Sequence, residues 1–292
     1  MVSDILAVVA QVSIFTFIIT SMLAMGMSLT VKQIIDPLKN VKVVLLALLA
    51  NFVLVPALAY ILTLVISLPE GLATGLIISG AAAGAPFLPK LVQLAKGNAA
   101  FSVGLMTLLM VVTVIYLPLV LPLLLPGASV SPWDIAKSLI LMMLLPLAIG
   151  LFIKARYEPT ADHLQPIMGQ VSSMAIVLGL VAILVLQYKT ILATFGTGGI
   201  LATILFLVGA LLIGMLLGGK QNRSVMGLGA AQRNLSAAML VGGQNFDDPQ
   251  VLGMIMVIGV LGLILLGAVA GELGKRVATA MQDPEQDAAG SS

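Results

Sequence analysis

Residues Ser79–Lys96 read SGAAAGAPFLPKLVQLAK and lie inside a long apolar segment of the chain. Gly84, Pro86 and Pro89 interrupt this segment, and a proline in a helix interior removes a backbone hydrogen bond and clashes with the preceding turn. Lys90 adds a charge at a depth where hydrocarbon is expected. The pattern therefore predicts a membrane-spanning segment that is broken near its middle, not a continuous helix.

A second stretch, Gly227–Ala238 (GLGAAQRNLSAA), has the same character. It is rich in small residues, including Gly229, and it carries Gln232, Arg233 and Asn234 within an apolar segment. Unwound backbone exposes N–H and C=O groups, which are tolerated at membrane depth only inside protein or against a watery cavity. Two broken polar segments in an apolar chain are typical of the substrate site of a secondary transporter.

The composition indicates a polytopic membrane protein. Of the 292 residues, 60% are hydrophobic and only 9% are charged, whereas a soluble domain carries about 25% charged residues. No cysteine is present, and the one histidine, His163, lies in the polar stretch Lys154–Pro166, which we predict to be a loop. Cysteine and histidine metal sites are therefore excluded. We expect one all-α transmembrane domain over residues 1–276, without a cofactor or a nucleic-acid partner.

Nine stretches of the sequence are long enough to cross a bilayer, which takes about 20 mostly apolar residues. Two of them are the broken segments, and short turns, several marked by Gly or Pro, separate the nine. The expected crossings are approximately 5–27, 42–66, 71–95 (broken), 99–125, 135–153, 167–188, 190–218, 223–244 (broken) and 250–272.

The basic residues in the connections divide unequally between the two sides of such a protein. Two of them, Lys137 and Lys189, fall on one side and ten fall on the other. Because cytoplasmic loops carry an excess of Lys and Arg, we expect the N-terminus outside and the C-terminus in the cytoplasm, with 277–292 as a disordered polar tail. The ten are Lys32, Lys39, Lys42, Lys96, Lys154, Arg156, Lys220, Arg223, Lys275 and Arg276.

The two broken segments are the third and eighth crossings, so they run in opposite directions. This order fits an inverted repeat of five helices whose first copy lacks its first helix, a recurring plan among transporters. We therefore predict a first repeat over about residues 1–126 and a second over about 133–276. Half-helix N-termini at the crossing would offer positive partial charge to an anion.

Four pieces of the chain carry a likeness to a known family: Met25–Leu29 (MGMSL), Val43–Pro56 (VVLLALLANFVLVP), Leu94–Asn98 (LAKGN) and Ala231–Leu240. The chain resembles the bile acid:sodium symporter family, in its nine-helix bacterial form without the first helix. The resemblance implies a panel domain, a core domain in which two discontinuous helices cross, and alternating access for a small organic anion. It also implies a location in a bacterial inner membrane.

The sodium ligands of that family are largely replaced in this chain. The resemblance places the family's Ser–Asn pair at Leu88 and Pro89, its Thr at Met106 and its Glu at Leu228. Leucine and methionine cannot supply the hard oxygen ligands that a small cation prefers, so sodium coupling is in doubt. Polar side chains, as remnants of the sodium sites, remain at Ser102, Gln232 and Asn51 (a Gln in the family).

The same regions gain two basic residues, Lys90 and Arg233, and have no carboxylate at the same expected depth. We hypothesise that these fixed cations replace the sodium ions and attract an anionic substrate, which leaves uniport, exchange and proton-linked transport open. Lysine can lose its proton when buried, so Lys90 is the better candidate for proton coupling. The candidate substrate-binding residues are Lys90, Arg233, Gln232, Asn234 and Asn51, and the candidate crossover-backbone residues are Gly84, Pro86, Pro89 and Gly229.

Each candidate side chain also has a purely structural interpretation. Lys90 can extend to the cytoplasmic interface, and Arg233 can cap the carbonyls that the break exposes. Gln232 and Asn234 can satisfy unwound backbone, and Asn51 can hold two helices together.

Four other functions stay open beside a sodium-independent anion carrier. One is a channel, which saturable counterflow would separate from a carrier. A conventional sodium-coupled symporter would keep the family's mechanism. A ligand receptor would bind without transport, and the expectation that no signalling domain is attached argues against it. An intramembrane enzyme is disfavoured, because no Asp pair lies inside a predicted crossing and Ser79 is eleven residues from Lys90, too far for an evident dyad.

Overall fold

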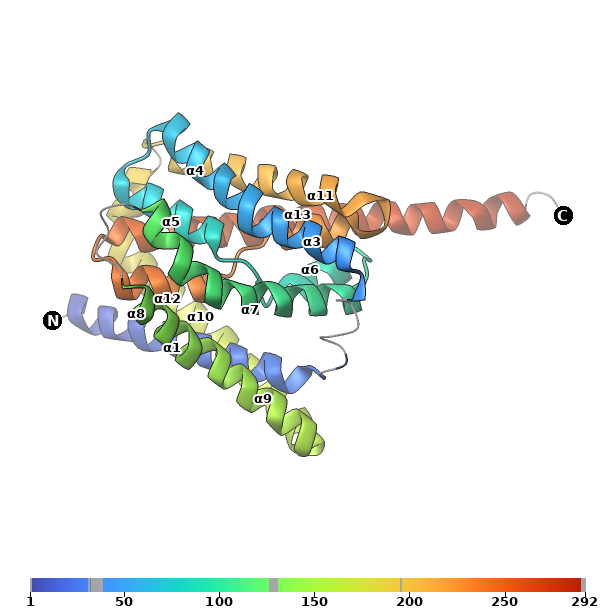
Figure 1. Ribbon diagram of the computed structural model, residues 1–292, viewed down its shortest axis with the longest axis horizontal. Helices are drawn as coiled ribbons and strands as arrows, with labels where there is room; N and C mark the ends of the chain where they lie inside the picture. Colours follow the sequence, from blue (N-terminus) through green and yellow to red (C-terminus); the bar gives the residue numbers. More distant parts are fainter. Residues whose placement is uncertain (1, 31, 33–38, 126–130, 195, 290–292) are drawn as a thin grey trace.

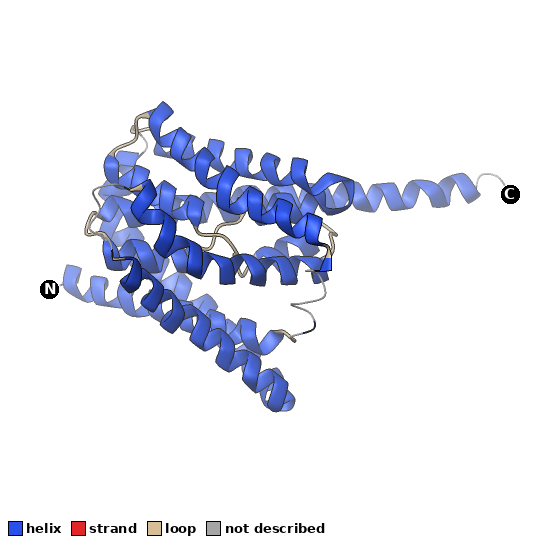
Figure 2. Ribbon diagram, viewed as in Figure 1, coloured by secondary structure: helices blue, strands red, loops and turns tan. Residues whose placement is uncertain are grey.

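The computed structural model describes residues 2–30, 32, 39–125, 131–194 and 196–289, and over these residues it consists of helices and short connections (Figure 1, Figure 2). No strand occurs within these ranges. The all-α fold that the composition predicts is confirmed. The predicted boundary between the two repeats falls partly on 126–130, which lie outside the described residues.

The described helices follow the order of the nine predicted crossings. Six stretches are long and apolar enough to span a membrane by length and composition, and one of them, Gly199–Asn245, combines two predicted crossings. The remaining two crossings are the pair α5–α6 and helix α10. In chain order the helices are α1 (Val2–Ser28), α3 (Val41–Leu49), η2 (Ala50–Leu54), α4 (Val55–Ile66), α5 (Glu70–Ala81), α6 (Leu88–Leu94), α7 (Ala99–Leu124), α8 (Pro132–Leu139), η3 (Ile140–Leu144), α9 (Leu145–Arg156), α10 (Glu158–Thr194), α11 (Gly199–Ala231), α12 (Leu235–Asn245) and α13 (Pro249–Ala289).

Both predicted breaks are confirmed. The first separates α5 from α6 over residues 82–87, and the second separates α11 from α12 over residues 232–234. Gly84 has a φ of 81°, and a Cβ at this position would lie 2.6 Å from the Cα of Met110 on α7. Only glycine combines this backbone conformation with so close an approach.

A third interruption lies at Gly219, where φ is 59° inside α11. It separates the part of α11 that was predicted as crossing 190–218 from the part that leads into the second break. Helix α11 therefore contains the seventh crossing and the start of the eighth, and the chain changes direction between them at Gly219.

A short π-helix, η2, precedes Pro56 in the second crossing. Proline has no N–H group, so the carbonyl of Phe52, four residues earlier, loses its usual α-helical donor. The hydroxyl of Tyr116 on α7 donates a hydrogen bond of 2.7 Å to this carbonyl. The defect inside the helix is thus compensated by a neighbouring helix, as buried backbone in a membrane requires.

The helices pack in two groups (Figure 1). Helices α1, α9 and α10 pack against one another, and α1 and α9 approach so closely that a Cβ at Gly150 would lie 2.5 Å from the carbonyl oxygen of Leu23. Helices α3 to α7 and α11 to α13 form the larger group, which contains both breaks. That these groups act as the panel and core that the resemblance implies stays a prediction.

Two predicted polar regions differ from the structure. The predicted loop over Lys154–Pro166 is helical, because α9 ends at Arg156 and α10 begins at Glu158, so His163 is an exposed residue of a helix. Lys154 supports this start through ion pairs with Glu158 and Asp162, at 3.0 and 2.7 Å.

The other difference is the C-terminal tail. Helix α13 continues to Ala289, into residues that we predicted to be disordered from 277 onward, and 290–292 lie outside the described residues. Alanine and glutamine are good helix formers, and they extend a helix that the preceding crossing has already nucleated.

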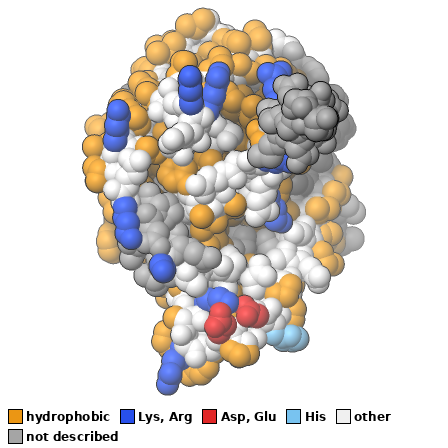
Figure 3. Space-filling view, turned by 90° about the vertical axis from the view of Figure 1, so that its right-hand side faces the viewer, with side chains coloured by type: hydrophobic (Ala, Val, Ile, Leu, Met, Phe, Trp, Pro, Cys, Tyr) orange, Lys and Arg blue, Asp and Glu red, His pale blue; other side chains and the backbone are white. Residues whose placement is uncertain are grey.

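The described chain begins and ends at opposite ends of the molecule's long axis (Figure 1). Lys and Arg side chains gather on the face from which the C-terminal helix extends (Figure 3). We call this face the basic face. Its location in the cytoplasm stays a prediction.

Candidate functional site

The two breaks meet and hydrogen-bond to each other, which defines the crossover. The backbone N–H of Asn234 donates to the carbonyl of Ala82 at 2.9 Å, and its side-chain Nδ2 donates to the carbonyl of Gly84 at 3.1 Å. Its Oδ1 accepts from the N–H of Ala237 at 3.1 Å and so caps the start of α12. Asn234 is fully buried. It therefore joins the second break to the first and starts the following half-helix.

Thr113 on α7 supports the first break from the other side. Its Oγ1 accepts a hydrogen bond from the N–H of Ala83 and donates one to the carbonyl of the same residue, both at 3.0 Å. Both groups are buried. Thr113 is not among the residues predicted from the sequence, although a hydroxyl within the long apolar segment of α7 is a recognisable signal.

Arg233 lies at the centre of the crossover and is 3% exposed. Its Nε donates to the carbonyl of Ser79 at 3.0 Å, and its Nη2 donates to that of Gly80 at 2.8 Å. Its Nη1 donates to the carbonyl of Ala230 at 2.8 Å and to Oδ1 of Asn51 at 3.1 Å. The guanidinium therefore has four oxygen partners from three different segments of the chain.

The electrostatic partner of Arg233 is backbone. No Asp or Glu in the described ranges forms an ion pair with it. Ser79 and Gly80 lie in the last turn of α5 and Ala230 in the last turn of α11. Each helix C-terminus carries a negative partial charge of about half an elementary charge, so two of them together offset about one positive charge. The arrangement stabilises a buried cation without a carboxylate.

Asn51 connects the crossover to the second crossing. It lies in η2, is 1% exposed, and donates through Nδ2 to the carbonyl of Ala47 at 3.0 Å while its Oδ1 accepts from Arg233. Its amide is therefore fully oriented by the protein. Asn51 is hydrogen-bonded to Arg233, and Asn234 is the next residue in the chain. Their role in binding a substrate stays a prediction.

Lys90 does not join them. Its side chain is exposed, and its Nζ lies 5.7 Å from the centre of the Phe87 ring. The expectation that Lys90 and Arg233 are two buried cations is wrong for Lys90. Lys90 lies in the first turn of α6, and its direction around that helix points it away from the core.

The remaining candidates of the crossover backbone are divided. Pro86 lies in the first break, but Pro89 lies in the first turn of α6, where a proline is well tolerated because the N–H has no helical acceptor. Gly229 lies inside α11, two residues before the helix ends, so its assignment to unwound backbone is wrong. Gln232 begins the second break and is 7% exposed.

Apolar side chains occupy the positions where the resemblance places most sodium ligands. Leu88, Met106 and Leu228 are all at most 1% exposed. The Cδ2 atom of Leu88 lies 3.3 Å from where a Cβ of Gly229 would be, so Leu88 packs directly on this glycine. Ser102 is buried and donates to the carbonyl of Ala99 in its own helix at 2.6 Å. This part of the core is hydrophobic packing.

Two hydroxyls near the breaks have no hydrogen-bond partner. They belong to Ser79, in the last turn of α5, and Ser236, in the first turn of α12, and both are buried. The sequence analysis named Ser79 only as an unlikely half of a catalytic dyad. Buried unsatisfied hydroxyls of this kind are found at functional sites and at internal waters.

A separate cavity of about 340 Å³ lies between α1 of the smaller helix group and α12 and α13 of the larger one. Gln11, Phe15, Met239, Gln244 and Leu252 are among the residues that line it. Gln244 accepts a hydrogen bond from Ser138 on α8, which links α8 to α12 beside this cavity. Neither glutamine was singled out in the sequence, because a single amide within a helix is not a distinctive signal.

The profile of the Sodium Bile acid symporter family matches residues 15–194. The chain belongs to this family. The match includes the first break and Thr113, and the packing of the helices into two groups agrees with it.

The chain resembles several proteins that are named as transporters or cotransporters. It is 28% identical over 188 residues to the probable sodium/metabolite cotransporter BASS3, chloroplastic, of Arabidopsis thaliana, which covers 63% of this chain and 43% of that protein. It is 28% identical over 177 residues to the uncharacterized sodium-dependent transporter YocS of Bacillus subtilis, which covers 59% and 54%. It is 26% identical over 241 residues to the probable sodium/metabolite cotransporter BASS1 of Arabidopsis thaliana, which covers 81% and 56%. The chain spans about half the length of these relatives.

Proposed function

We propose that this protein is a secondary transporter that moves a small organic anion by alternating access, with the Arg233 guanidinium in place of one coupling sodium ion. The observation that carries the proposal is the set of four oxygens around Arg233 at the crossover. Carbonyl and amide oxygens are the ligands that a small hard cation prefers. In this chain the Arg233 guanidinium, a cation that belongs to the protein, is hydrogen-bonded to these oxygens.

The apolar packing near the crossover supports the same proposal. A second ion would need oxygen ligands where Leu88, Met106 and Leu228 are buried. Desolvating a small cation among such side chains is very costly. The proposal is therefore of a carrier that binds its anion without family-type sodium ions.

We place the substrate pathway between the two helix groups, where Gln11 and Gln244 face a common cavity. Amide groups can bind a carboxylate or a sulfonate through their NH₂ donors. The hydrogen bond from Ser138 to Gln244 joins α8 to α12 beside this cavity and orients the Gln244 amide. Four of the five N–H donors of Arg233 are hydrogen-bonded to the protein, so its contribution to anion binding is mainly electrostatic. The basic face is then the cytoplasmic one.

Thermal unfolding of the purified protein tests the proposal, with a panel of keto acids, pantothenate-like acids and sulfonated anions in sodium buffer and in choline buffer. A ligand that binds only the folded state raises the apparent stability by about RT ln(1 + [L]/Kd). We expect at least one anion to stabilise the protein to the same extent in both buffers. Stabilisation that requires sodium would refute the replacement of the ion.

A conventional sodium/metabolite cotransporter is the second candidate function. The observation that favours it is the wording of the relatives' names, which describe sodium-dependent carriers. The two candidates differ in the same measurement, because the second predicts that binding and uptake into proteoliposomes are both lost when choline replaces sodium.

A further inference from the structure

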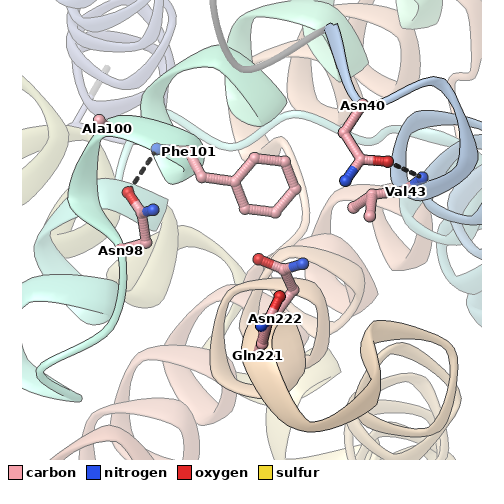
Figure 4. A pocket seen from close by; sticks show the side chains of 7 residues that line it. All are labelled: Asn40, Val43, Asn98, Ala100, Phe101, Gln221 and Asn222. Carbon is pink, nitrogen blue, oxygen red and sulfur yellow. Dashed lines mark hydrogen bonds between the residues drawn. The ribbon is translucent and has the colours of Figure 1, made fainter.

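A second cavity, of about 350 Å³, lies at the end of the molecule that carries the basic face. It is formed where α3 begins, where α7 begins and where α11 continues after the Gly219 reversal. Its principal side chains are Asn40, Val43, Asn98, Phe101, Gln221 and Asn222 (Figure 4). The cavity lies within the larger helix group and shares no lining residue with the one beside Gln11 and Gln244.

Two of its four amides have a defined orientation. Oδ1 of Asn40 accepts from the N–H of Val43 at 3.3 Å, and Oδ1 of Asn98 accepts from the N–H of Phe101 at 2.9 Å (Figure 4). Both bonds cap the start of a helix. Because the oxygens are engaged in this way, the NH₂ groups, which only donate, are the parts of these amides that remain for a ligand.

The other two amides complete a donor-rich wall. Gln221 and Asn222 rise from α11 toward the Phe101 ring, which projects into the space between the amides (Figure 4). No Asp or Glu is among the lining residues that the structure describes. The cavity thus offers several neutral donors beside one apolar aromatic face.

Exposed basic residues are close in sequence to the residues of this wall. Five exposed basic residues lie within two positions of a lining residue in the sequence, and no acidic residue occurs in 39–43, 96–101 or 219–224. A cluster of cations around a cavity raises the local concentration of anions. The five are Lys39, Lys42, Lys96, Lys220 and Arg223.

We propose that this cavity binds a phosphate ester, carried either by an anionic lipid headgroup or by a soluble metabolite. A phosphate has several acceptor oxygens and therefore matches several NH₂ donors that converge from three chain segments. The basic residues balance its charge, and Phe101 packs against the organic part next to the phosphorus. Basic pockets among membrane helices are suited to phosphate headgroups for the same reasons.

The test measures binding to the full chain in a neutral detergent at constant ionic strength. Apparent unfolding temperature is followed while dioctanoyl phosphatidylglycerol, dioctanoyl phosphatidylcholine or glycerol 3-phosphate is added. We expect a saturable rise with phosphatidylglycerol or with glycerol 3-phosphate, and none with phosphatidylcholine. A response to the lipid alone assigns the phosphate to a headgroup, and a response to glycerol 3-phosphate assigns it to a soluble ester.

The double variant Gln221→Leu/Asn222→Leu removes two donors without touching either helix cap. We expect it to weaken the response by about tenfold or more, since two hydrogen bonds to a charged group are lost. Gln93→Leu makes the same chemical change at an exposed position of α6 outside the cavity and is the matched control. An equal response of the wild type and the double variant, or no saturable response to either phosphate probe, would overturn the proposal. Neither readout depends on sodium or on transport.

Discussion

The two breaks meet at one place but bring different chemistry to it. Residues 82–87 (AAGAPF) contain no polar side chain, whereas residues 232–234 are Gln-Arg-Asn. The first break and the end of α5 offer carbonyl oxygens, and most of the donors come from Arg233 and Asn234 of the second break. Unwound backbone in an apolar core is therefore stable when another segment of the chain forms hydrogen bonds with its N–H and C=O groups.

Removing the charge of the second break should have the largest effect. Arg233→Ala leaves three carbonyls and the Asn51 amide oxygen without their donor, and we expect a loss of roughly 3–5 kcal/mol in unfolding free energy. Denaturant unfolding in detergent measures it. Arg276→Ala, which breaks only an exposed pair with Glu272 at 3.1 Å, is the control and should cost under about 1 kcal/mol.

The same variant tests whether the Arg233 guanidinium replaces a sodium ion. The four vacated oxygens form a hard ligand set, so we expect sodium, but not choline, to raise the unfolding temperature of Arg233→Ala. The wild type should not respond to sodium. Equal curves for the variant in the two salts would mean that the space left by the guanidinium is no cation site.

Substitution in the first break should act through the backbone. Gly84→Ala places a Cβ against Met110 at a positive φ, and we expect a loss of about 3 kcal/mol from strain and overlap. Gly271→Ala, at a helical position with open space around it, should instead be neutral or slightly stabilising. Thermal unfolding of the two variants measures the difference. Equal losses of stability would mean that the close approach of Gly84 to Met110 does not restrict this position to glycine.

Removing the hydrogen bonds between α7 and the first break should lower the unfolding free energy by a smaller but measurable amount. Thr113→Val removes both hydrogen bonds to Ala83 while keeping the shape, with an expected cost of about 1–3 kcal/mol. Thr107→Val on the same helix loses only a bond to the Val103 carbonyl of its own helix and should cost less than about 1 kcal/mol. If the two variants unfold alike, Thr113 does not hold the break.

The smallest effect is expected at the other predicted cation. Lys90→Met changes an exposed side chain, so the unfolding free energy should stay within about 0.5 kcal/mol of the wild type. Anion-dependent stabilisation, measured as for the wild type, should also persist. A loss comparable with that of Arg233→Ala would place Lys90 back among the groups that hold the crossover.

Much of the fold is predictable from local sequence. The lengths of the apolar segments give the crossings, and Gly84 with Pro86 gives the first break, because glycine and proline act on the backbone of their own turn. Helix ends were less accurate, as at Lys154–Pro166, where ion pairs extend a helix into polar sequence. The grouping of Asn51, Arg233 and Asn234 was also predictable, since all three are polar residues in apolar segments.

The sequence alone predicts a helical membrane protein with two broken crossings. Only the tertiary structure separated Lys90 from Arg233. Lys90 follows the first break by three residues, and Arg233 lies within the second. The Lys90 side chain points out from α6, whereas that of Arg233 reaches the ends of α5 and α11. The same holds for Thr113, whose partner is thirty residues away. Hydrogen bonds between distant segments depend on which faces of the helices meet, and no single segment carries that information.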